Sequence, residues 1–235
     1  MKIIKGFSTK ADGNMKIYSG VVHTSDNENQ KNKENRRKFL EKAGLKDDNL
    51  ILAGLVHGNR IVIAKDSDKG KVISDCDGFV TDTLGVILGV TAADCLPIFF
   101  WNKQETLAGI VHAGWRGVQK EIALEMINIF VNKFGCSAKD INVKIGPHIK
   151  DCHFEIQADV VKNFLGYQTS IKEVGGGKYL NLGNIIKEQL VSVGVEVKNI
   201  QDALECTFCE NDKYFSYRRD KPKDIEAMLA YITIV

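Results

Sequence analysis

The sequence predicts an α/β protein in a single domain, residues 1–235, and three observations lead to that fold class. Short apolar runs punctuated by glycine, typical of buried strands, alternate with segments whose apolar residues recur at helical spacing. A hydrophobic content of 44% over 235 residues is enough to bury a full core. No linker or internal repeat divides the chain. We therefore expect one mixed α/β domain.

The first half of the chain is dominated by strand patterns. Weak alternation in the opening 25 residues, clearest over 16–22, predicts an early strand or hairpin. A polar Asn- and Lys-rich run then leads into a short amphipathic helix over 35–44, which a glycine ends. The apolar runs that follow predict strands at 51–56, 61–64, 86–90, 96–101 and 107–111.

The second half alternates helices with strands. A helix is predicted over 118–134, where Ile122, Met126, Ile129 and Phe130 recur at helical spacing, and a buried strand follows at 141–145. The three glycines at 175–177 indicate a hairpin or loop tip. The remaining predictions are helices near 158–165 and 182–193 and strands near 195–200, 214–218 and 227–234.

The overall charge excludes some classes of function. The chain has 32 basic and 30 acidic residues, so its net charge of +2 creates no large field to attract nucleic acid or a membrane surface. No stretch approaches the length of a spanning helix, and the N-terminus has no apolar signal region. We expect a cytoplasmic protein whose 6 cysteines stay reduced and are mostly buried, with a monomer favoured.

Three residues able to bind a metal stand where predicted strands end: His57, Cys95 and His112. Ligands of open α/β sheets gather at such strand ends. Zinc accepts imidazole and thiolate together, and a catalytic zinc keeps three protein ligands and one open position. Copper is less favoured, because a multicopper centre needs more histidines than the 5 present. The alternative is that these histidines are structural, since no compact motif links the three residues.

An anion-binding composition follows His112. Ala113-Gly114-Trp115-Arg116-Gly117 joins a predicted strand to a predicted helix, and glycines there let backbone N–H groups approach a ligand. Arg116 is a candidate for binding phosphate through two hydrogen bonds, and Trp115 for stacking on a base. The alternatives are an arginine that stabilises its own fold and a tryptophan in the core.

Several longer segments together resemble the YfiH family, also called laccase-domain or peptidoglycan-editing-factor proteins. The matching segments, in chain order, are Asp77–Thr81, Thr91–Pro97, Gly109–Gly117, Ile145–Ile149, Cys152–Ile156, Cys206–Thr207 and Phe215–Arg219. They cover nearly the whole chain in order and spacing.

This resemblance implies a three-layer α/β fold with a mixed β-sheet and one catalytic zinc ion held by His57, Cys95 and His112. It also implies phosphorolysis of adenosine, inosine, guanosine or methylthioadenosine to the base and a sugar phosphate, with adenosine deamination as a second activity. A purine nucleoside and phosphate are then the partners, and Arg116, Trp115 and His148 are candidate substrate-binding residues. For His148 a structural role is the alternative.

Two positions depart from the family pattern. Leu55 stands two residues before His57 where glutamine is expected, and Lys221-Pro222-Lys223-Asp224 replaces the usual Thr-Gly-Arg after Arg219. Because of these two differences, we expect the substrate preference, or one edge of the substrate pocket, to differ from that of the family.

Three rival functions stay open. A cysteine hydrolase or deamidase would use Cys95 as nucleophile and His112 as base. A classical zinc nucleoside deaminase would use His153-Phe154-Glu155 with Cys206 and Cys209, but Glu205 stands where that motif has proline, so we interpret these residues as structural. The third rival is a non-catalytic partner in peptidoglycan precursor editing.

Overall fold

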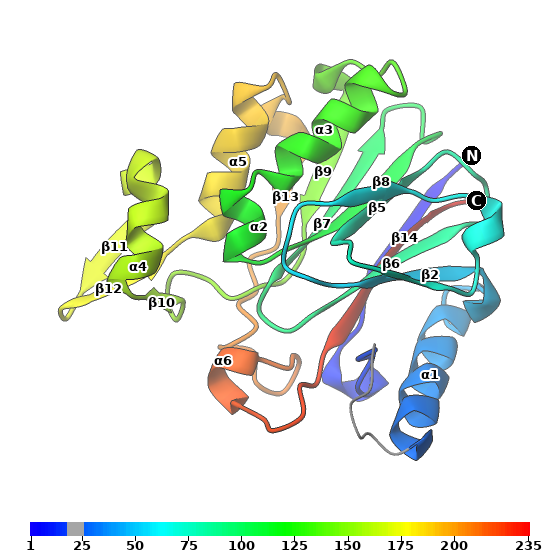
Figure 1. The fold of residues 1–235 in the computed structure, drawn as a ribbon, viewed down its shortest axis with the longest axis horizontal. Helices are drawn as coiled ribbons and strands as arrows, with labels where there is room; N and C mark the ends of the chain where they lie inside the picture. Colours follow the sequence, from blue (N-terminus) through cyan, green and yellow to red (C-terminus); the bar gives the residue numbers. More distant parts are fainter. Residues whose placement is uncertain (18–25) are drawn as a thin grey trace.

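The computed structural model describes residues 1–17 and 26–235. Two large β-sheets are stacked face to face, with helices outside each of them, and a small third sheet projects at one end (Figure 1). The α/β class predicted from the sequence is confirmed.

The first large sheet joins the two ends of the chain. Its order is β1 (Ile3–Phe7), β14 (Met228–Ile234), β6 (Ile87–Ala92), β2 (Leu50–Gly54) and β4 (Val72–Ser74). β14 lies antiparallel to β1 and β6, whereas β2 is parallel to β6 and β4. The pairing of Ile3 with Ile234 brings the two termini together, as Figure 1 shows.

The second large sheet carries most of the candidate site. Its order is β13 (Ile200–Asp202), β9 (Ile141–Ile145), β7 (Leu96–Asn102), β8 (Ala108–Ala113), β5 (Gly78–Thr81) and β3 (Ile61–Ile63). The third sheet has the order β10 (Glu155–Ile156), β12 (Gly177–Leu180) and β11 (Ile171–Val174). Gly175 and Gly176 turn β11 into β12 with φ of 58° and 83°, which confirms the hairpin predicted there.

Alternating side chains divide the core into layers. Leu50 and Leu52 pack toward α1 (Asp26–Glu41), while Ile51 and Ala53 of the same strand pack between the two large sheets. On β7, Ile98 and Phe100 pack against the helices α2 (Trp115–Gln119), α3 (Ile122–Asn132) and α5 (Leu182–Ser192). Because the strands separate into two stacked sheets, the helices and sheets make four layers, where three were expected.

Some predicted elements differ from the structure for local reasons. The helix predicted over 118–134 is interrupted at Glu121, whose φ of 59° separates α2 from α3. The strand predicted at 214–218 is wrong, because the Ser216 side chain caps the short helix α6 (Tyr217–Asp220). The predicted strand at 195–200 is mostly a turn before β13.

The boundaries of other elements differ from the predicted ones. α1 begins at Asp26, well before the predicted 35, and the helix predicted near 158–165 is regular only over α4 (Ala158–Val161). Strand β5 was not predicted. An early strand is confirmed as β1, whereas most of the pattern at 16–22 lies outside the described residues.

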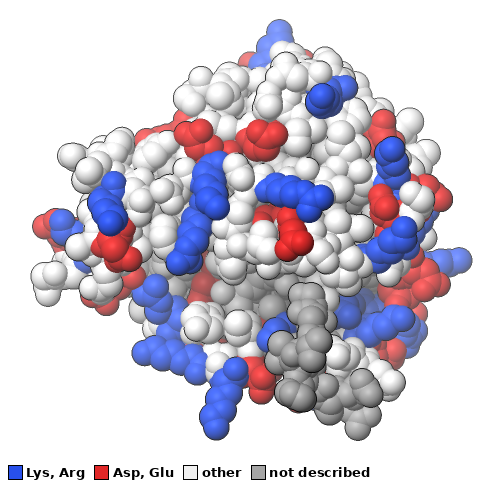
Figure 2. All heavy atoms as spheres, viewed as in Figure 1, with Lys and Arg blue, Asp and Glu red and all other residues white. Residues whose placement is uncertain are grey.

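The surface shows no concentration of one charge on the face drawn in Figure 2, where basic and acidic side chains are interspersed. This agrees with the net charge of +2. Within residues 1–17 and 26–235, no helix combines the length and the apolar character that crossing a membrane requires.

Candidate functional site: a His/Cys/His cluster beside a cavity

The structure brings together the three predicted ligand residues from three different segments. His57 follows β2, Cys95 lies between β6 and β7, and His112 is in β8. One ligand atom from each lies within 4.8 Å of the others. His112 Nε2 is 3.4 Å from His57 Nδ1, and the two rings meet edge to face. The side chains therefore surround one point at the strand ends.

His112 is held in the tautomer that a metal ligand needs. Its Nδ1 lies 2.8 Å from the carbonyl oxygen of Thr91, and because a carbonyl only accepts hydrogen bonds, the proton is on Nδ1. Nε2 is then a free lone pair directed at the cluster. Burial, and secondarily the neighbouring His57, lowers the pKa of His112 to about 4, so the imidazole is neutral near pH 7.

The buried carboxylate of Asp77 shapes the loop that carries His57. It accepts backbone hydrogen bonds from Val56 at 3.2 Å, His57 at 2.8 Å and Gly58 at 2.7 Å. His57 has a φ of 56°, a left-handed conformation that is costly for a residue with a Cβ. The three hydrogen bonds to Asp77 compensate for this strain and fix the direction of the imidazole.

A second carboxylate, Asp94, positions Cys95. Asp94 has a φ of 87°, and it accepts hydrogen bonds from the Thr207 hydroxyl and the Arg218 backbone N–H, both at 2.7 Å. Burial, with the charges of Asp94 and Asp77, raises the pKa of Cys95 to about 12. A free thiol with such a pKa is a poor nucleophile, which opposes the cysteine-hydrolase hypothesis.

Space for an ion is preserved by Gly114 at the start of α2. A Cβ at this position would lie 3.0 Å from Cys95 Sγ and 3.0 Å from His57 Nδ1, so any side chain here would fill the space between the ligands. A neutral imidazole, a thiol and a second imidazole around such a space match the donors that zinc prefers. The residues present therefore fit a zinc ion with three protein ligands.

The cluster opens into a cavity of about 580 Å³, a size typical of small-molecule sites. Its wall combines aromatic, aliphatic and basic side chains, among them Trp115, Arg116, Phe154, Tyr217, Arg218 and Ile149. The Arg116 guanidinium stacks on the Trp115 ring at 4.3 Å. Both predicted residues of the 113–117 segment thus line the cavity next to the cluster.

His148, the third predicted substrate-binding residue, lies elsewhere. It is fully buried and is not among the residues that line the cavity. Its Nδ1 lies 2.8 Å from the carbonyl oxygen of Gly146, and a Cβ on Gly183 of α5 would lie 3.2 Å from its Nε2. The structure therefore places His148 in the packing between β9 and α5, outside the cavity wall.

Sequence reasoning assigned no role to Asp77, Asp94 or Arg218. The available signal was a carboxylate directly beside an apolar run, at Asp77 before Gly78 and at Asp94 before Cys95. Arg218 had no such signal, because its segment was predicted as a strand. The segment is in fact the short helix α6, which the Ser216 side chain caps.

The fold and site define an α/β protein with a His/Cys cluster able to bind a metal ion beside a cavity of small-molecule size. The chain belongs to the family described as multi-copper polyphenol oxidoreductase laccase, whose model matches residues 5–234. Relatives named YfiH and YlmD confirm the resemblance to the YfiH family.

Two of these relatives are named purine nucleoside phosphorylases. YlmD of Geobacillus stearothermophilus is 33% identical over 211 residues, which is 84% of this chain and 77% of that protein. YfiH of Shigella flexneri is 32% identical over 204 residues, covering 85% of this chain and 80% of that one.

Solved structures agree with the fold. The Bacillus licheniformis hypothetical protein YfiH superposes with a TM-score of 0.90 at 27% identity, over 99% of this chain and 93% of that one. YlmD from Geobacillus stearothermophilus superposes with a TM-score of 0.89 at 30% identity, over 99% and 92% of the two chains.

Proposed function

We propose that the chain is a zinc-dependent purine nucleoside phosphorylase formed by one catalytic domain, residues 1–235. Its substrates are adenosine, inosine, guanosine or methylthioadenosine, which phosphate converts to the free base and a sugar 1-phosphate. Hydrolytic deamination of adenosine is a second activity at the same centre. The observation that carries the proposal is the His57/Cys95/His112 cluster opening into a cavity with basic and aromatic walls. The names of the relatives support it.

The metal centre would be held by His57 Nδ1, Cys95 Sγ and His112 Nε2. When bound, zinc supplies a Lewis acid with one open position for an oxygen atom. The chain's own contribution is orientation. Thr91 fixes the His112 tautomer, and Asp77 holds the His57 loop by three backbone hydrogen bonds. These partners keep the ligands in place without rearrangement during the reaction.

The substrates are recognised by opposite features of the cavity wall. Arg116 and Arg218 supply positive charge for phosphate, and a guanidinium binds phosphate oxygens through paired hydrogen bonds. Trp115 and Phe154 offer flat apolar surfaces for a purine. Leu55 and Ile225 also line the cavity, so the two departures from the family pattern lie at or beside its edge and are expected to influence which purine is preferred.

The direct test is to incubate the zinc-loaded protein with adenosine, with and without phosphate, and to separate adenine from inosine by chromatography. Phosphate-dependent adenine is the expected product. Inosine formed equally with and without phosphate, with no adenine, would contradict phosphorolysis, and the absence of any product would contradict both activities.

A second experiment separates the role of Arg116 from that of the metal. In Arg116→Ala we expect the KM for phosphate to rise about tenfold or more, the loss of one charge-assisted pair, while zinc content stays unchanged. Lys120→Ala, an exposed cation at the end of α2 outside the cavity wall, is the matched control. An unchanged phosphate KM in Arg116→Ala would remove Arg116 from the phosphate site.

A further inference from the structure

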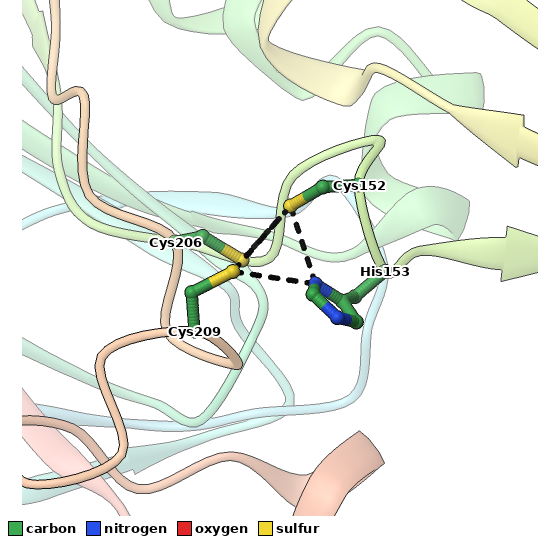
Figure 3. A group of neighbouring side chains, drawn as sticks. All are labelled: Cys152, His153, Cys206 and Cys209. Atoms are coloured by element: carbon green, nitrogen blue, oxygen red, sulfur yellow. Dashed lines mark hydrogen bonds between the residues drawn. The ribbon is translucent and has the colours of Figure 1, made fainter.

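A second group of metal-binding side chains lies outside the cavity, on two loops far apart in the sequence. Cys152 and His153 are in the loop between β9 and β10, and Cys206 and Cys209 follow β13. Their four ligand atoms lie within 4.8 Å of one another. Figure 3 shows the side chains converging on a common point from the two loops.

The spacing of these atoms is that of a tetrahedral zinc site. Zn–S bonds of about 2.3 Å and Zn–N bonds of about 2.0–2.1 Å at tetrahedral angles require S···S separations of about 3.8 Å and S···N separations of about 3.5 Å. Cys152 Sγ lies 3.6 Å from Cys206 Sγ and 3.7 Å from Cys209 Sγ. His153 Nδ1 lies 3.3 Å from the sulfurs of both Cys152 and Cys209.

The surroundings of the cluster also resemble a metal site. The backbone N–H of Lys150 donates a hydrogen bond to Cys206 Sγ at 3.4 Å, a contact that favours a thiolate. The His153 ring stacks on Phe208 with centroids 4.0 Å apart, which holds the imidazole toward the three sulfurs. Cys152 and Cys209 are exposed, contrary to the expectation that most cysteines are buried, so packing alone does not explain their convergence.

We propose that Cys152, His153, Cys206 and Cys209 bind one zinc ion in a closed structural site. Four protein ligands leave no open position, unlike the three at the cavity. This assignment also explains the pattern that suggested a nucleoside deaminase. Cys152 would be the fourth ligand, at the position that a catalytic water occupies in a deaminase. Glu155, the acid of that pattern, lies instead with its carboxylate beside Gly177 in the hairpin sheet.

The zinc would join two segments that build the cavity wall. The first loop is flanked by Ile149 and Phe154, both of which line the cavity. In the second, Thr207 is next to Cys206 and donates its hydroxyl hydrogen bond to Asp94, which also receives the N–H of Arg218. A parallel bridge between His148 and Cys206 and an ion pair of 2.8 Å between Lys150 and Asp202 also connect the two segments, and an ion here would add a further link between them.

A disulfide is the competing explanation for the three cysteines. Cys152 Sγ is almost equally far from Cys206 and Cys209, and one disulfide would leave the third thiol and His153 without a role. A zinc ion uses all four side chains.

The test compares the wild-type chain with Cys209→Ser and Cys152→Ser, two changes at exposed positions. Zinc per chain is measured by mass spectrometry after weakly bound metal has been removed. Each variant is expected to contain about one zinc ion per chain less than the wild type. Cys136→Ser, at a half-buried cysteine in neither cluster, is the matched control and is expected to match the wild type. Circular dichroism verifies that each variant is folded.

Equal zinc content in the wild type and in folded Cys209→Ser and Cys152→Ser would overturn the proposal. A disulfide among Cys152, Cys206 and Cys209 in protein prepared without reductant, found by peptide mapping, would also overturn it. The difference in metal content does not depend on turnover or on the cavity centre. A failure here is therefore distinguishable from a failure of the proposed phosphorylase activity.

Discussion

The two His/Cys clusters of this chain differ in the backbone that carries them. His57, Cys95 and His112 lie at or beside the ends of strands in the two stacked sheets, and the buried carboxylates of Asp77 and Asp94 support them from behind. The four residues of the second cluster lie on loops, two of them exposed, with backbone N–H groups, that of Lys150 among them, donating to the Cys206 sulfur.

The difference explains how one chain can use the same kinds of ligand for two purposes. Strand ends leave one side of the first cluster open to the cavity, and outer hydrogen bonds fix its three ligands before an ion arrives. At the second cluster the proposed ion would add to the contacts between the two loops, and four ligands would enclose it. We therefore expect reactivity at the first cluster and stability at the second.

The variant Cys95→Ala is expected to have the largest effect, because it removes a ligand of the first cluster and leaves the second cluster intact. We expect this variant to lose the zinc of the cavity centre and to reduce phosphorolysis more than about 100-fold, beyond the loss caused by removing an outer hydrogen-bond partner. Zinc analysis and adenine release are the measurements. Cys136→Ala is the control, and full activity in Cys95→Ala would exclude the metal assignment.

Asp77→Asn tests whether outer hydrogen bonds prepare the first centre. The amide replaces one carboxylate oxygen by an NH2 group facing backbone N–H donors, so the His57 loop loses its fixed direction. Zinc affinity, measured by competition with a chromophoric chelator, is expected to fall about 10–100-fold. The exposed Asp82→Asn is the control, and equal affinities for the two variants would show that Asp77 does not position the ligands.

The packing between β9 and α5 is expected to be sensitive to acid because it contains the buried His148. Burial, with the charge of Lys150, lowers the pKa of His148 to about 4, whereas in the unfolded chain it is near 6.5. The unfolded state therefore binds the proton first as pH falls, and stability present above pH 6.5 is lost progressively toward pH 4.

For the metal-free protein we expect the free energy of unfolding to drop by about 2 kcal/mol from this histidine between pH 7 and pH 5. Urea denaturation of the wild type and His148→Asn measures it, and the variant should lose less stability over that interval. The same pH dependence in both proteins would contradict this assignment.

The smallest effect expected is that of one methyl group at the first centre. In Gly114→Ala the added Cβ would lie 3.0 Å from Cys95 Sγ and His57 Nδ1, so the ligands must separate to admit an ion. We expect zinc affinity to fall about tenfold, within the range for disturbed ligand orientation. Gly166→Ala, where a Cβ meets no atom within 4 Å, is the control, and zinc content at the second cluster should be unchanged.

The fold class was predictable from sequence because it depends on local patterns, whereas the first cluster was predicted from residues standing near predicted strand ends together with the resemblance to the YfiH family. His57, Cys95 and His112 each follow or end an apolar run, and apolar runs indicate strands well. The break between α2 and α3 was not predictable, because Glu121 adopts a left-handed conformation inside a continuous helical pattern. The division into two stacked sheets likewise depends on long-range pairing, such as that of Ile3 with Ile234.

The second cluster was visible in the sequence only as a misleading motif. His153 and the Cys206/Cys209 pair match part of a deaminase motif, whereas nothing in the sequence connects Cys152 with them, since the two loops are separated by the hairpin sheet and α5. Only the three-dimensional structure brings the four side chains together in one cluster.

The most direct test of the two-centre account is anomalous diffraction from crystals of the zinc-loaded protein, recorded above and below the zinc absorption edge. The account predicts one zinc peak enclosed by Cys152, His153, Cys206 and Cys209, and another held by His57, Cys95 and His112 with one side facing the cavity. No peak at the first centre, or a disulfide in place of a peak at the second, would contradict it.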